Sequence, residues 1–87
     1  MKVKEDKIKH IELLGFHDVS DYDDDATCSY YRKCFGDGNY IEIGDPYNST
    51  NTDIIIYLHN EEAGDYVPNF ALFTLFQMFQ QGFIEED

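Results

Sequence analysis

The chain has 87 residues, with 6 Lys or Arg against 18 Asp or Glu, so its formal charge is −12. This length suits one domain, and we expect residues 1–87 to form a single domain. Hydrophobic residues make up 43% of the chain, which is too many for a disordered acidic tail. No stretch approaches the about 20 apolar residues of a membrane span, and the first six residues are not followed by the apolar region of a secretory signal. Direct nucleic-acid binding is not expected either, because phosphate contacts need Lys and Arg.

The N-terminal segment predicts a helix over residues 4–14. Ile8, Ile11 and Leu14 recur on one side at helical spacing, and Gly15 supplies a left-handed stop. Residues 18–26 carry too many like charges to pair as an interior strand, so we expect an exposed loop, with a short extended piece at 16–19.

A β-hairpin is predicted next, with strands at 27–35 and 39–43 and a turn at Gly36-Asp37-Gly38. Ile41 and Ile43 are expected to face inward, and Glu42 to attract Arg32 or Lys33 across the strands. Residues 44–52 have turn chemistry, and residues 53–59 form the strongest predicted strand, with one face made of Ile54, Ile56 and Leu58.

The last predicted element is a helix over residues 69–81, entered by Pro68, capped by Asn69 and ended by Gly82. Its large apolar residues are expected to face the core: Leu72, Leu75, Phe76, Met78 and Phe79. The element order predicts an α+β fold, α-β-β-β-α, with a three-stranded antiparallel sheet packed against helices.

The sequence offers no clear catalytic or metal-binding motif. Cys28 and Cys34 would lie about 20 Å apart in one strand, too far for a disulfide, and two free thiols fit the cytoplasm. An EF-hand beginning at Asp21 would need glycine and glutamate where the chain has Ala26 and Arg32. We therefore expect a protein that is not an enzyme, with no cofactor and no metal.

The charge is unevenly distributed along the chain, because residues 34–87 contain no Lys or Arg. One interpretation is a protein that is merely soluble or salt-adapted; the other is a surface that meets a basic protein partner. Tyrosines within acidic loops suit an Arg-rich surface, although such rings can also close local clusters. The candidate partner-binding residues are Asp21, Tyr22, Asp23, Asp24, Asp25, Asp37, Asp45, Tyr47, Glu61, Glu62, Asp65 and Tyr66.

The chain is short and acidic, and its predicted elements are a helix, three strands and a helix. It has a Gly36-Asp37-Gly38-Asn39 turn and an acidic tail after Gly82-Phe83. In these features it resembles small phage-encoded inhibitors. In plan it is similar to type II anti-CRISPR proteins that mimic duplex DNA and occupy the PAM-reading groove of Cas9. The resemblance covers architecture and carries over no individual residue. It implies carboxylates that stand in for phosphates in the basic groove of a Cas nuclease or other DNA-binding enzyme.

Same-face residues of an extended segment are about 6.6 Å apart, so Asp21, Asp23 and Asp25 could present a row of anions at a spacing comparable to that of a nucleic-acid backbone. Two alternatives stay open. One is an immunity protein against a nuclease toxin, which differs only in its partner. The other is a phage or bacterial interaction module that binds through apolar surface. The sequence leaves open the oligomeric state and which acidic loop makes contact.

Overall fold

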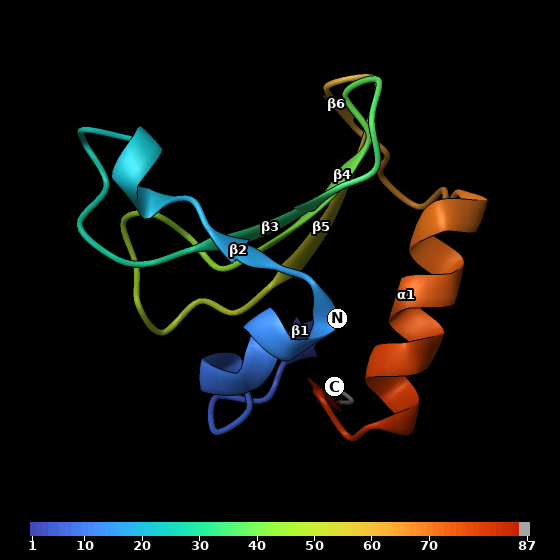
Figure 1. Cartoon of the computed structure of the whole chain (residues 1–87), viewed down its shortest axis with the longest axis horizontal. Helices are drawn as coiled ribbons and strands as arrows, with labels where there is room; N and C mark the ends of the chain where they lie inside the picture. The colour runs from blue at the N-terminus through green and yellow to red at the C-terminus, as the bar shows by residue number, and fades with distance from the viewer. Residues whose placement is uncertain (86–87) are drawn as a thin grey trace.

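The computed structural model describes residues 1–85, which form two β-sheets, one α-helix and two short 3-10 helices (Figure 1). In chain order the elements are β1 (Lys2–Val3), η1 (Ile8–Leu14), β2 (His17–Asp18), η2 (Ser20–Tyr22), β3 (Tyr31–Cys34), β4 (Tyr40–Ile43), β5 (Ile54–Leu58), β6 (Glu61–Glu62), α1 (Asn69–Gln80) and β7 (Ile84–Glu85).

The larger sheet is an antiparallel meander in the order β2-β3-β4-β5-β6. Arg32 pairs with Glu42 between β3 and β4, and Ile43 pairs with Ile54 between β4 and β5. The predicted hairpin and the strand that follows it are therefore confirmed, but the first hairpin strand is shorter than predicted. It begins at Tyr31, and residues 27–30 belong to the loop before it. Because successive residues of a strand face opposite sides, the isoleucines of β4 and the even-numbered isoleucines of β5 share one face of this sheet.

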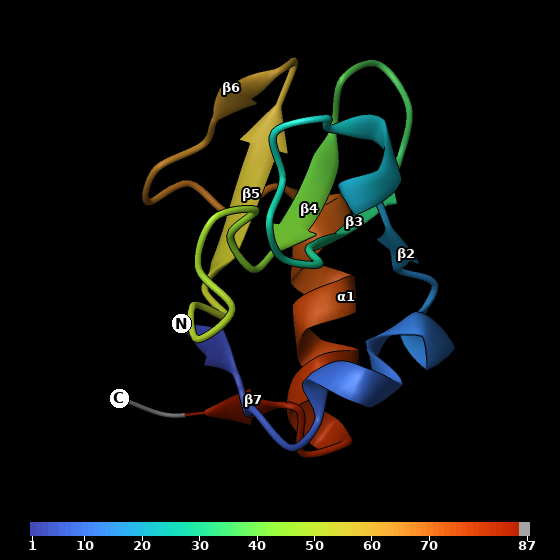
Figure 2. The ribbon, with the colours of Figure 1, turned by 90° about the vertical axis from the view of Figure 1, so that its left-hand side faces the viewer.

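The core lies between that face and α1. Ile41 and Ile43 are completely buried, as predicted, and they cluster with Ala71 and Met78 of α1 and with Phe16, which follows η1. Figure 2 shows α1 behind the sheet, with η1 below it. The opposite face of the sheet carries Tyr40, Glu42 and Tyr57, which are half-buried.

The smaller sheet brings the two ends of the described chain together. Val3 of β1 pairs with Ile84 of β7, and the amide of Lys4 donates to the carbonyl of Phe83 at 2.8 Å. Thr52, just before β5, donates its hydroxyl to the carbonyl of Val3 at 2.6 Å. The terminal strands are thereby fixed to the start of β5.

The predicted α-β-β-β-α order with a three-stranded sheet is wrong, because the principal sheet has five strands and a second sheet has two. The short extended piece predicted at 16–19 contains β2. The missed strands (β1, β6 and β7) have two residues each, too short for alternation to reveal them. Their pairings depend on tertiary contacts, such as the hydrogen bond from the amide of Lys4 to the carbonyl of Phe83.

The predicted first helix is also different in kind, since η1 is a 3-10 helix that begins at Ile8. Its apolar residues Ile8, Ile11 and Leu14 are spaced three apart. Because a 3-10 helix has three residues per turn, residues spaced three apart line up along one of its sides. The spacing of these apolar residues is therefore compatible with a 3-10 helix as well as with an α-helix. Gly15 ends η1 in the left-handed conformation, with φ of 91°, as predicted.

The orientation predicted for α1 is partly wrong. Leu72, Phe76 and Phe79 are expected in the core but are exposed. Thr74 is buried instead, and its hydroxyl donates to the carbonyl of Phe70 at 3.3 Å. A helix that is apolar on nearly all sides has no hydrophobic periodicity from which its buried face could be predicted. The capping prediction is wrong as well, because Asn69 is the first helical residue and Pro68 is the N-cap, with no side-chain hydrogen bond.

Candidate functional site

Two acidic loops lie together at one end of the larger sheet, one before β3 and the other between β4 and β5 (Figure 1). The amides of Thr27 and Cys28 both donate to the carbonyl of Pro46, at 2.8 and 2.9 Å, and join the loops. The structure thus brings together seven of the twelve candidate residues, which we call the acidic end: Asp21, Tyr22, Asp23, Asp24, Asp25, Asp45 and Tyr47.

Short-range hydrogen bonds shape these loops. Asp23 Oδ1 accepts from the amide of Asp25 at 3.0 Å, and Asp45 Oδ1 accepts from the amide of Tyr47 at 2.8 Å. Such turns form because a short acidic side chain reaches the backbone two residues on. Each of these two bonds uses one oxygen of a carboxylate, and Asp23 also interacts with the side chain of Tyr30. The loops therefore hold these aspartates in fixed positions.

The neighbouring Asp18 serves the loop in the same way. The amide and hydroxyl of Ser20 donate to Asp18 Oδ1 at 2.9 and 2.6 Å. The hydroxyl first, and then the amide, hold the pKa of this carboxyl below its usual value, because both bonds favour the charged form. Asp18 therefore adds to the charge beside the acidic end.

The tyrosines of the acidic end are on the surface. The ring of Tyr22 is 88% exposed and that of Tyr47 is 62% exposed. Tyr30, between the loop and β3, is buried, and burial, followed by the charges of Asp23 and Glu42, raises its pKa. Two aromatic faces among carboxylates are therefore available to a cation from outside.

The cations nearest along the sequence are engaged elsewhere. Arg32 pairs with Glu42, with 2.7 Å between Nη2 and Oε2, and Lys33 Nζ donates to the carbonyl of Leu14 at 2.9 Å. The loops of the acidic end contain no Lys or Arg of their own. The charge of the acidic end is thus left for solvent or for a partner.

The other candidate residues lie apart from the acidic end. Asp37 is in the β3–β4 turn, which sits beside the β5–β6 turn because the amide of Asn60 donates to the carbonyl of Gly38 at 2.9 Å. Glu61 and Glu62 form β6 at this opposite end of the sheet (Figure 1). Asp65 and Tyr66 follow in the connection to α1, where both are exposed. The twelve residues therefore form no single site.

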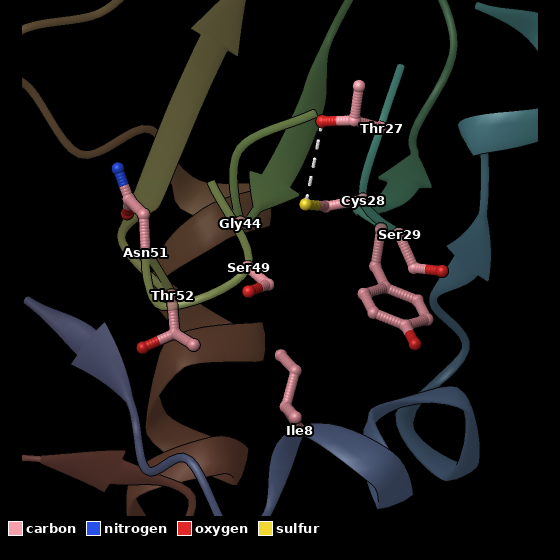
Figure 3. A pocket seen from close by; sticks show the side chains of 9 residues that line it. Ile8, Thr27, Cys28, Ser29, Gly44, Ser49, Asn51 and Thr52 are labelled. Carbon is pink, nitrogen blue, oxygen red and sulfur yellow. Dashed lines mark hydrogen bonds between the residues drawn. The ribbon is translucent and has the colours of Figure 1, made fainter. Parts of the chain in front are cut away.

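A pocket of about 470 Å³ lies beside the acidic end (Figure 3). The hydroxyl of Thr27 is 3.7 Å from the sulfur of Cys28 within it. Its lining contains neither a histidine nor a carboxylate: Ile8, Thr27, Cys28, Ser29, Tyr31, Gly44, Ser49, Asn51 and Thr52. Cys28 therefore has no base in this lining to generate a nucleophilic thiolate.

Within residues 1–85, no three His, Cys, Asp or Glu side chains are placed to hold a metal ion. Cys28 and Cys34 are free thiols, as predicted, but they do not share a strand, because Cys28 lies in the loop before β3. No helix in the same range has the length and apolar character needed to cross a bilayer.

Sequence reasoning missed one surface, the outer side of α1. Leu72, Phe73, Phe76 and Phe79 are each more than half exposed there. The available signal was the absence of charge between Asn69 and Gln80, because a helix without a polar face must be covered on more than one side.

Comparisons of the chain with protein-family models, with curated proteins and with solved structures find no significant match.

Proposed function

We propose that this chain is a non-enzymatic acidic inhibitor that mimics DNA and occupies the basic groove of a nucleic-acid enzyme through the acidic end. The observation that carries this proposal is the joining of two loops into one surface with five aspartates, two exposed tyrosines and no cation. The partner class is a Cas nuclease or another DNA-binding enzyme, as the resemblance to anti-CRISPR proteins implies.

Elementary electrostatics supports this mode of binding. A groove that binds DNA is lined with Lys and Arg, and the carboxylates of the acidic end offer the same sign of charge as phosphates. Long-range attraction then accelerates encounter. When the protein is docked, the rings of Tyr22 and Tyr47 can stack on guanidinium groups of the partner. This cation–π attraction acts at short range and adds to the long-range attraction between opposite charges.

An immunity protein against a nuclease toxin would use the same surface, because it too covers a DNA-binding groove. The two functions differ in partner only. They are separated by testing guide-loaded Cas9 on its PAM-containing duplex alongside the nuclease domain of a bacterial toxin on plain duplex.

The direct test is competition with DNA. A fluorescent duplex is bound to each enzyme, the chain is titrated in, and the fall in anisotropy is measured from 50 to 300 mM salt. We expect displacement at a one-to-one ratio by at least one enzyme, with an affinity that falls steeply as salt rises, because the docked carboxylates replace phosphates.

Matched variants locate the contact. D21N/D24N/D25N removes three exposed charges from the acidic end, and D37N/E61Q/E62Q removes three exposed charges from the opposite end of the sheet. The first variant should bind more than tenfold more weakly and lower the salt slope by about one unit per lost contact. The second should retain binding. Displacement from none of the enzymes, or equal binding by the two variants, would overturn the proposal.

A separate observation favours the alternative of binding through apolar surface. The outer side of α1 exposes four large apolar side chains, and this surface does not include any residue of the acidic end.

A further inference from the structure

The outer side of α1 is a continuous apolar surface. Leu72, Phe73, Phe76 and Phe79 are 58%, 75%, 59% and 54% exposed, and we call these four side chains the Phe face. At 3.6 residues per turn they fall within about one third of the helix circumference. Asn69 and Gln80 share this arc and are exposed with them.

A groove runs along one flank of the Phe face. It has a volume of about 330 Å³ and is lined by Met1, Leu72, Leu75, Phe76, Phe79 and Ile84. Phe73, the most exposed of the four, does not line the groove. The Phe face therefore has an apolar groove on one flank and the exposed ring of Phe73 on the other.

The size of the Phe face is enough for a specific contact between two copies. With about 200 Å² for a fully exposed Phe ring, the exposed parts of the four side chains amount to about 500 Å². Two such faces give about 1,000 Å², and polar residues at the rim raise the total into the range of stable interfaces. A single patch of this size is at the upper end for a monomer and marks an interaction site.

Charge selects the same surface. Two copies that each carry −12 repel one another wherever their carboxylates meet. The segment from Asn69 to Gln80 has no charged residue, so two copies can approach along α1 with the least repulsion.

We infer that the chain forms a homodimer in which the α1 helices of two copies pack antiparallel about a two-fold axis near Phe76. In this register Phe76 meets Phe76 of the second copy, and Phe73 lies at the level of Phe79 of that copy. The interface is then self-complementary, because the same residues of both copies form it. The acidic end lies on the side of the molecule away from α1 (Figure 1), so both acidic ends remain open.

The test is sedimentation equilibrium of the full chain from 1 to 200 μM at 150 mM salt. We expect a species of twice the 10.2 kDa chain mass. F73Q/F76Q should reduce this to the monomer mass with an unchanged circular dichroism spectrum, since both rings are exposed. L13Q is the matched control, because Leu13 is 82% exposed on η1, outside the Phe face, and it should remain dimeric.

A cross-linking variant tests the register. F76C in a C28S/C34S background should form a disulfide-linked dimer under mild oxidation, whereas L13C in the same background should not. A monomer at all concentrations, a dimer that F73Q/F76Q leaves intact, or equal cross-linking by the two variants would each overturn the inference. Competition with DNA by the acidic end can succeed or fail independently of these outcomes.

Discussion

The side chain of Arg32 donates two hydrogen bonds to the same oxygen of Glu42, from Nε at 3.1 Å and from Nη2 at 2.7 Å. The guanidinium also lies over the ring of Tyr40, with Cζ 4.3 Å from the ring centroid, and Tyr40 stacks on Tyr57 at 4.5 Å. This row crosses β3, β4 and β5 on the sheet face turned away from α1. It gives that face a fixed polar and aromatic network.

The ion pair should contribute to stability. The side chain of Glu42 is 13% exposed and that of Arg32 is 32% exposed, so the pair is shielded from solvent more than a surface ion pair. E42Q leaves the guanidinium half-buried without its counter-charge, and we expect a loss of about 1–2 kcal/mol in the free energy of unfolding.

Urea unfolding followed by circular dichroism measures this loss. E62Q is the control, because Glu62 is an exposed residue of the neighbouring strand β6 and its neutralisation should change stability by less than about 0.5 kcal/mol. An E42Q protein as stable as E62Q would show that the pair adds nothing.

Stability should fall at alkaline pH because of half-buried tyrosines. Burial first, then the nearby charges of Asp18 and Glu12, raises the pKa of Tyr31. Burial, then Glu42, Tyr40 and Glu62, raises the pKa of Tyr57. A pKa raised in the folded state means that the folded chain holds the proton more tightly. The contribution of these two tyrosines to the free energy of unfolding is therefore complete below their unfolded pKa near 10. It is lost as the pH rises through their folded pKa.

Urea midpoints between pH 8 and pH 11.5 test this expectation. Y31F/Y57F keeps both rings but removes the ionisable hydroxyls, so its stability should decline less steeply than that of the wild type. Y22F removes the hydroxyl of a ring that is 88% exposed and should follow the wild-type curve. A decline of the same steepness in Y31F/Y57F would contradict the assignment.

The parts of the fold that the sequence predicts are those with a local signal. Alternation places Ile41 and Ile43 in the core, and the hairpin places Glu42 across from Arg32 or Lys33. The structure shows that the partner is Arg32. The two-residue strands β1, β6 and β7 have no such signal, because their pairing is decided by tertiary contacts. The buried face of α1 cannot be predicted from the spacing of its apolar residues, because apolar residues lie on nearly all sides of this helix.

The candidate site is predictable in part from topology. The loop before a hairpin and the loop after it must meet at the same end of a sheet, so Asp23 and Asp45 could have been expected at one end once the hairpin was assigned. Glu61 follows the adjacent strand β5 and therefore falls at the opposite end. Periodicity alone does not tell which side chains are exposed, and the exposure of Tyr22 emerges only from the structure.

The two proposed surfaces should respond to salt in opposite directions. Raising salt from 50 to 300 mM weakens the attraction between the acidic end and a basic groove, so DNA competition should lose at least tenfold in affinity. The same change screens the repulsion between two chains of charge −12 and strengthens apolar contacts along α1, so the dimer dissociation constant should decrease. Anisotropy and sedimentation measured in the same buffers compare the two effects. F73Q/F76Q should still lose DNA competition as salt rises, but it should show no dimer at any salt concentration. A dimer that weakens with salt would place charged groups, instead of the Phe face, at the interface between the copies.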